Sequence, residues 1–240
     1  GGEINLKDAL ANSVNTVTAY LMKQVGPQKV RKMARAMGLK GTIPAAPSIC
    51  LGTPDVSVYE MVGAYGTFAN KGVYTTPVFL NRIEDKNGVV LDEFSPVTKE
   101  VLSEEKAYVM LNLMQGVTKK GSGQRLGWKY GLKNQIAGKT GTTQNQSDGW
   151  FMGVVPNLVT GVWTGAEDRS VHFRTITLGQ GANMALPIWG EYMTRVYNDS
   201  NLGISKEDFE VPNTLNIQIN CAKFENDNFD FDEEAENEEF

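Results

Sequence analysis

One short segment of the chain combines a cation, hydroxyl groups and a glycine: Lys139, Thr140, Gly141 and Thr142. In a strand, successive side chains point to opposite faces, and a glycine lets the backbone of a ligand approach closely. A cation and two hydroxyl groups beside an exposed strand edge suit a peptide that ends in a carboxylate and adds as an extra strand. The N–H groups of such a strand can also stabilise a developing oxyanion. Because an ordinary polar strand has the same residues, this segment alone does not identify a function.

A second candidate element is Ser13-Val14-Asn15, at the junction between two expected helices. A hydroxyl group and an amide two residues apart could pass a proton and hold a substrate amide. Ser or Asn before a helix is more often a cap, which is the alternative interpretation. Ser13-Val14-Asn15 therefore indicates a function only in combination with the segment around Lys139.

Helices are expected to position both elements, because apolar residues recur at spacings of three and four through much of the chain. Ser57 followed by Glu60 is a capping box and predicts the start of one helix. A closing helix is predicted to begin at Pro187. The other predicted helices cover residues 5–12, 17–25, 27–38 and 103–117.

Two antiparallel strand pairs are expected. Strand-forming residues around Asn87-Gly88 predict a hairpin over residues 78–94, and its charged side chains predict that it packs at the periphery, away from the binding groove. Residues 149–155 and 158–165 flank a short turn and are predicted to pair. Helices, one inserted hairpin, strands and a final helix predict an α+β fold, in which helices cover an antiparallel sheet.

Ser13-Val14-Asn15 and Lys139-Thr140-Gly141, in this order, resemble the S-x-N and K-T-G motifs of penicillin-binding proteins and serine β-lactamases. The surrounding sequence is similar to the transpeptidase domain of the bifunctional, class A penicillin-binding proteins over most of residues 1–195. Five segments carry this resemblance in the order of the family: LKDALANSVNTVTAYLMKQVG, LGTPDVSVYEMVGAYGTFANKGVYTTP, LMQGVTKKGSG, AGKTGTTQNQSDGWFMGVVPNLVTGVWTG and ALPIWGEYM. The resemblance implies the penicillin-binding-protein/serine β-lactamase-like transpeptidase fold, with the N-terminal part of the domain upstream of residue 1.

The activity that the resemblance implies is D,D-transpeptidation, which cross-links peptidoglycan stem peptides ending in D-Ala-D-Ala. A serine is acylated with loss of the terminal D-Ala, and an amine of a neighbouring stem peptide then takes the acyl group. The implied partners are these stem peptides and β-lactam antibiotics, and no cofactor is implied. An upstream anchor would hold the protein on the extracytoplasmic side of the membrane.

The resemblance also implies a role for each motif residue. Ser13 would relay a proton to the leaving amine, and Asn15 would bind the acyl-donor peptide. Lys139, Thr140 and Thr142 would hold the terminal carboxylate of the substrate, and the N–H of Thr142 would form half of the oxyanion hole. All five residues are therefore expected to converge on one groove.

The sequence departs from the family at its first motif, S-x-x-K, which supplies the nucleophile and its lysine base before S-x-N. None of the twelve residues before Ser13 is a serine. One literal match, from Ser103 to Lys106, lies between the other two motifs. Glu104 and Glu105 would favour a charged lysine there, whereas a base that activates serine must be neutral. Ser103 is instead predicted to cap a helix, and the nucleophile is expected upstream, so that residues 1–240 alone are inactive.

Net charge differs sharply between two predicted parts of the 240-residue chain. Residues 221–240 contain nine acidic residues and one lysine, a net charge of −8, which leaves +3 of the total of −5 on residues 1–220. This composition predicts a disordered acidic tail after a transpeptidase domain at residues 1–220, with an acidic docking tail as the alternative. No apolar run of 18 residues could span a bilayer.

Other function classes find little support. No basic stripe with interleaved aromatic residues indicates nucleic-acid binding. Cys50 and Cys221 lack metal-ligand spacing and are expected to be unpaired thiols, and the single His172 is expected on the surface, so no metal site is predicted. The remaining alternatives are a D,D-carboxypeptidase or β-lactamase-like hydrolase, and a noncatalytic module that binds stem peptides.

Overall fold

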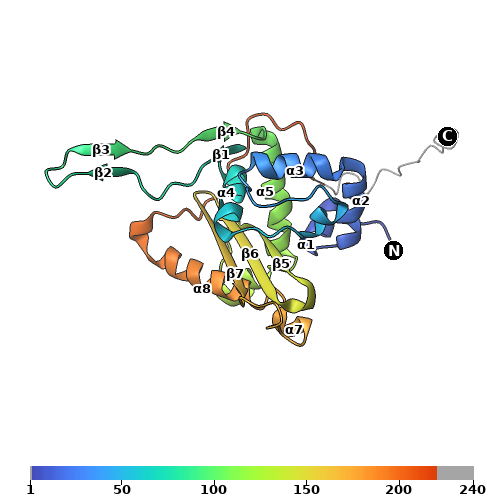
Figure 1. Cartoon of the computed structure of the whole chain (residues 1–240). Coiled ribbons are helices and arrows are strands. Elements are labelled where there is room, and N and C mark those ends of the chain that lie inside the picture. The colour runs from blue at the N-terminus through green and yellow to red at the C-terminus, as the bar shows by residue number, and fades with distance from the viewer. Residues whose placement is uncertain (1, 221–240) are drawn as a thin grey trace.

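The structure of the chain is a computed structural model that describes residues 2–220. Its centre is a three-stranded antiparallel sheet with helices packed on both faces (Figure 1). The predicted α+β fold with a helix-covered antiparallel sheet is therefore confirmed. The predicted acidic tail at 221–240, with Cys221, lies outside the described residues.

The sheet has the order β5-β6-β7, with β5 at Ala137–Thr142, β6 at Asp148–Val155 and β7 at Leu158–Gly165. The predicted pairing of residues 149–155 with 158–165 is confirmed by the β6–β7 register. In the other pair, Lys139 lies opposite Met152 and Thr140 lies opposite Phe151. β5 pairs only with β6 among the described strands, so its second edge has no strand partner there.

One face of the sheet packs against α8 (Ala185–Asn198) and α6 (Arg125–Tyr130). The ring of Phe151 meets the ring of Trp189 edge to face, with 5.2 Å between centroids. This geometry is favourable for aromatic rings, and both side chains are fully buried.

The opposite face packs against α5 (Glu104–Lys119), α4 (Val58–Ala69) and α1 (Leu6–Ala11). Val154 lies in this cluster, whereas its neighbours on β6, Phe151 and Val155, lie in the other. The side chains of β6 thus alternate between two buried layers, which is why its sequence is apolar almost throughout.

Local sequence signals fix several helix ends. Ser57 and Glu60 form both hydrogen bonds of the predicted capping box at the start of α4. Ser103 accepts a hydrogen bond from the N–H of Lys106, so its predicted role as the cap of α5 is confirmed. The closing helix α8 begins at Ala185, so its predicted start at Pro187 was two residues late. Proline is tolerated there because N–H groups of a first helical turn have no partner within the helix.

The remaining elements lie around this centre. Helices α2 (Asn15–Val25) and α3 (Pro27–Ala36) follow α1, and α7 (Ile176–Gly179) precedes α8. Short 3-10 helices lie at Pro47–Leu51, Gln144–Gln146 and Ser200–Leu202.

The predicted hairpin is formed by β2 (Arg82–Glu84) and β3 (Val90–Glu93), and it projects from the body of the fold (Figure 1). Every residue of both strands is exposed, and in the turn between them only Asp85 is partly buried. Its peripheral position is thus confirmed. A second pair, β1 (Val73–Thr75) with β4 (Thr98–Glu100), forms the base of this ribbon and was not predicted.

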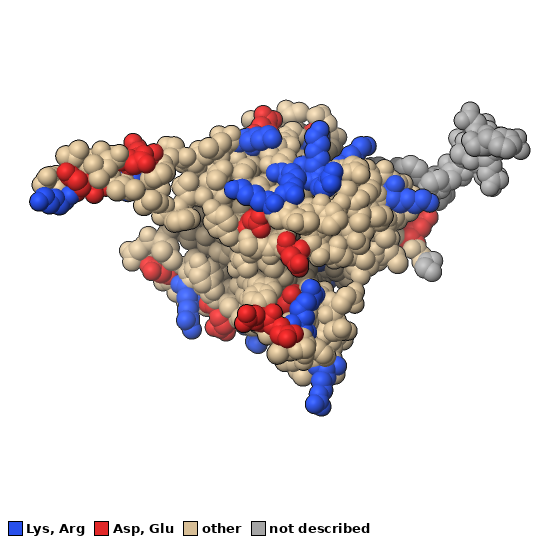
Figure 2. Space-filling view, in the orientation of Figure 1, with Lys and Arg blue, Asp and Glu red and all other residues tan. Residues whose placement is uncertain are grey.

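Basic side chains gather on the surface around α3 (Figure 2). Among residues 2–220, no helix combines the length and apolar character needed to cross a membrane. Within the same residues, no group of acidic, histidine and cysteine side chains could hold a metal ion. Within residues 2–220 Cys50 forms no disulfide, and His172 is exposed.

Candidate functional site

Ser13 ends α1 in an uncommon backbone conformation. Its φ of 55° lies in the left-handed region, which glycine usually occupies at this position after a helix. The N–H of Ser13 donates to the carbonyl oxygen of Leu10 at 3.1 Å, and the N–H of Val14 donates to the carbonyl oxygen of Ala9 at 2.9 Å. These two bonds form a Schellman motif, so the helix end holds the Ser13 side chain in place at the cost of local strain.

Lys139 reaches Ser13 from β5. Its Nζ atom donates to Oγ of Ser13 at 2.9 Å and to the carbonyl oxygen of Thr140 at 2.8 Å. Burial lowers the pKa of Lys139 to about 8, because a desolvated ammonium group is less stable than a hydrated one. No ion pair of Lys139 exists among residues 2–220. The contact confirms that the two motifs meet.

The end of β5 is held by a second segment. The N–H of Gly181 donates to Oγ1 of Thr142 at 2.9 Å, and a Cβ atom on Gly181 would overlap the carbonyl oxygen of Gly141. Glycine at 181 therefore permits a close approach that orients the Thr142 hydroxyl group. A strand edge without a strand partner, as β5 has here, is where backbone N–H groups can bind an oxyanion or an added peptide strand.

Asn15 is less closely joined to the strand. It is the first residue of α2, two positions after Ser13, and its side chain is exposed. Among the described residues, no hydrogen bond links it to β5. The structure thus joins Ser13 directly to Lys139 and leaves the amide of Asn15 facing solvent near the same helix junction.

Ser122 is a site residue that the sequence alone did not identify. Its Oγ atom lies 2.6 Å from Oγ1 of Thr140, and either hydroxyl group could be the donor. Ser122 belongs to the loop between α5 and α6, within the segment LMQGVTKKGSG. The signal that could have found it is a hydroxyl residue between two glycines in one of the segments that carry the family resemblance.

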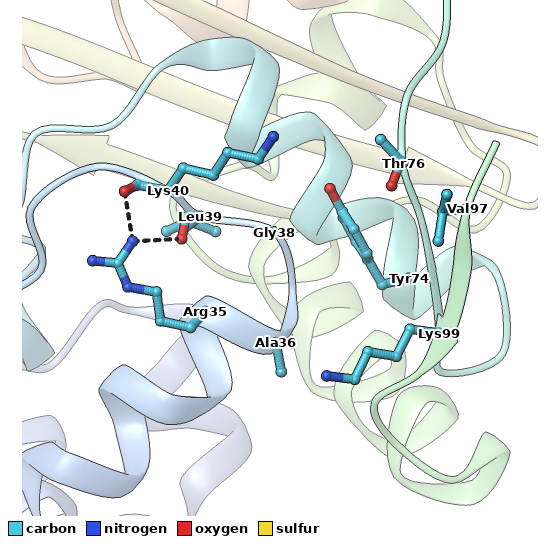
Figure 3. Close-up of a pocket in the computed structure, with 9 residues that line it drawn as sticks. All are labelled: Arg35, Ala36, Gly38, Leu39, Lys40, Tyr74, Thr76, Val97 and Lys99. Atoms are coloured by element: carbon cyan, nitrogen blue, oxygen red, sulfur yellow. Dashed lines mark hydrogen bonds between the residues drawn. The ribbon is translucent and has the colours of Figure 1, made fainter. Parts of the chain in front are cut away.

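A separate hollow of about 530 Å³ lies between the end of α3 and the β1–β4 pair (Figure 3). Lys40, Tyr74 and Lys99 line it, and no residue of the two motifs does. The Arg35 guanidinium group in its wall donates to the carbonyl oxygens of Leu39 and Lys40, so it serves the local backbone. The hollow is separate from both motifs and is not the candidate active site.

Relatives of known sequence are penicillin-binding proteins. Penicillin-binding protein 1A of Aquifex aeolicus is 37% identical over 225 residues, which are 91% of this chain and 28% of the relative. Penicillin-binding protein 1B of Haemophilus influenzae is 33% identical over 193 residues, which are 80% of this chain and 24% of the relative. The chain thus spans about a quarter of the length of these curated relatives.

Solved structures share the fold. Penicillin-binding protein 1A from Haemophilus influenzae matches with a TM-score of 0.78 at 21% identity, covering 89% of this chain and 36% of that one. PonA1 from Mycobacterium tuberculosis, solved in complex with penicillin V, matches with a TM-score of 0.73 at 26% identity. The match covers 90% of this chain and 61% of the PonA1 chain.

The comparison with protein families agrees with these relatives. The penicillin binding protein transpeptidase domain matches residues 1–167, which include both the Ser13 and the Lys139 motifs. The resemblance to class A members is confirmed by the relatives named penicillin-binding protein 1A. The chain belongs to the transpeptidase domain family of penicillin-binding proteins.

Proposed function

We propose that the chain is part of a peptidoglycan D,D-transpeptidase. Its Lys139, Thr140 and Thr142 would form a carboxylate cradle, the part of the active site that binds the terminal carboxylate of the substrate. The observation that carries this proposal is the 2.9 Å contact between Nζ of Lys139 and Oγ of Ser13, beside the open edge of β5. A partly buried cation without an ion pair among the described residues suits an anionic ligand, because a carboxylate would compensate its desolvated charge.

A stem peptide ending in D-Ala-D-Ala fits this arrangement. Its extended backbone would add to the open edge of β5, and its terminal carboxylate would bind Lys139 and the hydroxyl groups of Thr140 and Thr142. The N–H of Thr142 would stabilise the oxyanion that forms when the scissile carbonyl is attacked. Ser13 would pass a proton to the leaving amine, since it lies within hydrogen-bond reach of Lys139. Asn15 would bind the acyl-donor peptide.

The nucleophile in this proposal is a serine outside residues 1–240, in an S-x-x-K motif earlier in the same polypeptide. The only literal match in the chain starts at Ser103, and that hydroxyl group caps α5. The relatives are several times longer than the part that this chain matches, which is consistent with further catalytic elements there. The serine would be acylated and then release its acyl group to an amine of a second stem peptide.

β-Lactams are the second ligand class that we propose. A β-lactam carries a carboxylate close to its strained amide, so the same cradle would orient it for acylation. PonA1, which shares the fold at 26% identity, was solved in complex with penicillin V. The substrate also implies an extracytoplasmic location for this part of the protein, because peptidoglycan is cross-linked outside the cytoplasm.

Labelling by a fluorescent penicillin tests the proposal. We expect the full-length protein to be labelled covalently and the isolated 240-residue chain to remain unlabelled. In the full-length protein, Lys139→Ala should slow labelling by about ten- to a hundredfold, because a hydrogen bond between charged groups is lost. A full-length protein that is not labelled would instead support a noncatalytic binding module. Rapid release of the label to water would support a hydrolase.

A further inference from the structure

One loop residue contacts both halves of the site. The N–H of Ser122 donates to the carbonyl oxygen of Ala11 at 3.1 Å, two residues before Ser13. The hydroxyl oxygen of Ser122 lies 2.6 Å from that of Thr140, the residue after Lys139. Ser122 therefore links the end of α1 to β5 through two hydrogen bonds.

The glycines beside Ser122 fix the position of its backbone. The N–H of Gly121 donates to the carbonyl oxygen of Gly116 at 3.1 Å, and the N–H of Gly123 donates to that of Val117 at 2.9 Å. Both loop glycines are buried, and a Cβ atom on Gly121 would overlap the carbonyl oxygen of Ala11. The close approach of the loop to α1 thus depends on glycine at this position.

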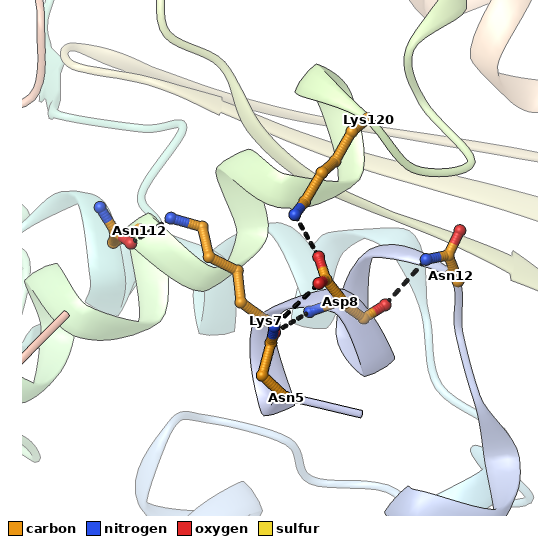
Figure 4. Close-up of polar contacts among 6 residues, drawn as sticks. All are labelled: Asn5, Lys7, Asp8, Asn12, Asn112 and Lys120. Carbon is orange, nitrogen blue, oxygen red and sulfur yellow. Dashed lines mark hydrogen bonds and ion pairs between the residues drawn. The ribbon is translucent and has the colours of Figure 1, made fainter. Parts of the chain in front are cut away.

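Polar contacts hold α1 against α5 next to this loop (Figure 4). Lys120, at the end of α5, forms an ion pair with Asp8 of α1. Within α1, the side chain of Asn5 accepts a hydrogen bond from the N–H of Asp8 at 2.8 Å and caps the helix. Farther along α5, Nζ of Lys7 donates to Oδ1 of Asn112 at 2.7 Å. These contacts leave little freedom for Ser122 to move away from α1.

A hydroxyl group has one proton to donate, whereas a carboxylate can only accept. If Thr140 donated to Ser122, it would have no proton left for a bound carboxylate. If Ser122 donates to Thr140, the Thr140 proton is free, and the two bonds strengthen each other.

We propose that Ser122 is a positioning residue that donates to Thr140 and so directs the Thr140 hydroxyl group toward the carboxylate of a stem peptide or β-lactam. This inference rests on the proposed function, because it needs a ligand carboxylate in the cradle. Ser122 acts through Thr140 and need not touch the ligand. Its removal should therefore weaken recognition of ligands that carry the carboxylate and should affect other ligands less.

The test is the second-order rate of acylation of the full-length protein by benzylpenicillin and by its methyl ester, which lacks the negative charge. We expect Ser122→Ala to slow acylation by the acid about three- to tenfold and to lower the acid-to-ester rate ratio. Ser122→Thr, which keeps the hydroxyl group, should retain most of the ratio. If Ser122→Ala does not fold, Ser122→Cys replaces it, because a thiol keeps the shape but donates weakly.

Thr118→Val is the matched structural control. Oγ1 of Thr118 donates to the carbonyl oxygen of Ile136 at 2.5 Å and links α5 to the start of β5 without contacting Thr140. This variant should lower the melting temperature and leave the acid-to-ester ratio unchanged. An unchanged ratio in the Ser122 variants, or an equal loss in Thr118→Val, would overturn the positioning role.

Lys139→Ala separates this inference from the proposed function. If Lys139→Ala lowers the acid-to-ester ratio but Ser122→Ala does not, only the role of Ser122 fails. If neither variant changes the ratio, the carboxylate cradle itself fails.

Discussion

Nζ of Lys139 donates to Oγ of Ser13 at 2.9 Å, although the two residues are 126 positions apart in the sequence. The contact joins a partly buried cation on a strand to a serine that follows a helix end and has a left-handed backbone conformation. Neither feature is favourable for an isolated residue, since burial destabilises the ammonium charge and the left-handed conformation strains the serine. Their combination at one point is typical of a binding or catalytic site.

Acylation by a β-lactam acid should decrease as the pH rises through about 8. Burial lowers the pKa of Lys139 to about 8, so the side chain is charged below this pH and becomes neutral above it. The cation that would attract the carboxylate is thus present on the acidic side and lost on the alkaline side. Rates for benzylpenicillin and its methyl ester, measured across this range, test the expectation.

The methyl ester is the control for this pH dependence, because it offers no negative charge to Lys139. Lys139→Arg gives a second control, since arginine stays protonated far above this range. The acylation rate should decrease less near pH 8 with the methyl ester, and also less in Lys139→Arg, than in the wild type with benzylpenicillin. A benzylpenicillin rate that follows the ester rate at every pH would contradict the role of Lys139.

Gly121→Ala should destabilise the protein by about 1–3 kcal/mol, because the added methyl group would overlap the carbonyl oxygen of Ala11, and backbone atoms cannot move aside cheaply. Thermal unfolding measures the loss. Gly127→Ala in α6 is the matched control, since the nearest atom to its Cβ would be 3.9 Å away. Equal melting temperatures for the two variants would show that Gly121 does not pack closely against the carbonyl oxygen of Ala11.

Asp8→Asn should lower the stability by about 0.5–1 kcal/mol at neutral pH, a modest value because Lys120 is largely exposed. The hydrogen bond and charge of Lys120 hold the pKa of Asp8 below its usual value. The stabilisation is therefore present above the unfolded pKa of about 3.9 and is lost as the pH falls through the lower folded value.

Unfolding midpoints at neutral and at acidic pH test this expectation, with Glu3→Gln as the control, because Glu3 is exposed and forms no ion pair among the described residues. The difference between wild type and Asp8→Asn should shrink in acid. A difference that stays constant would show that the charge of Asp8 is not the cause.

Much of the fold was predictable because its signals are local. The capping box of Ser57 and Glu60 and the cap at Ser103 lie within one helical turn of the helices they start. The β1–β4 pair was not predicted, because two strands of three residues far apart in sequence leave no periodic pattern. The start of α8 before Pro187 was missed because proline is compatible with several positions of a first turn.

The site was predictable only in part. The residue types around Lys139 indicated a carboxylate cradle, but its contact with Ser13 could be expected only from the order of the two motifs. Ser122 could not be assigned a role, since its place beside Thr140 depends on the packing of Gly121 against α1. Such packing joins residues distant in sequence and is not encoded in any short pattern.

The location of the penicillin adduct tests the central claim most directly. The full-length protein would be treated with benzylpenicillin, digested with a protease and analysed by mass spectrometry to find the acylated residue. We expect the adduct on a serine outside residues 1–240, because Ser103 caps a helix, whereas Ser13 and Ser122 are proposed to relay a proton and to position Thr140. An adduct on Ser13, Ser103 or Ser122 would contradict this assignment of roles.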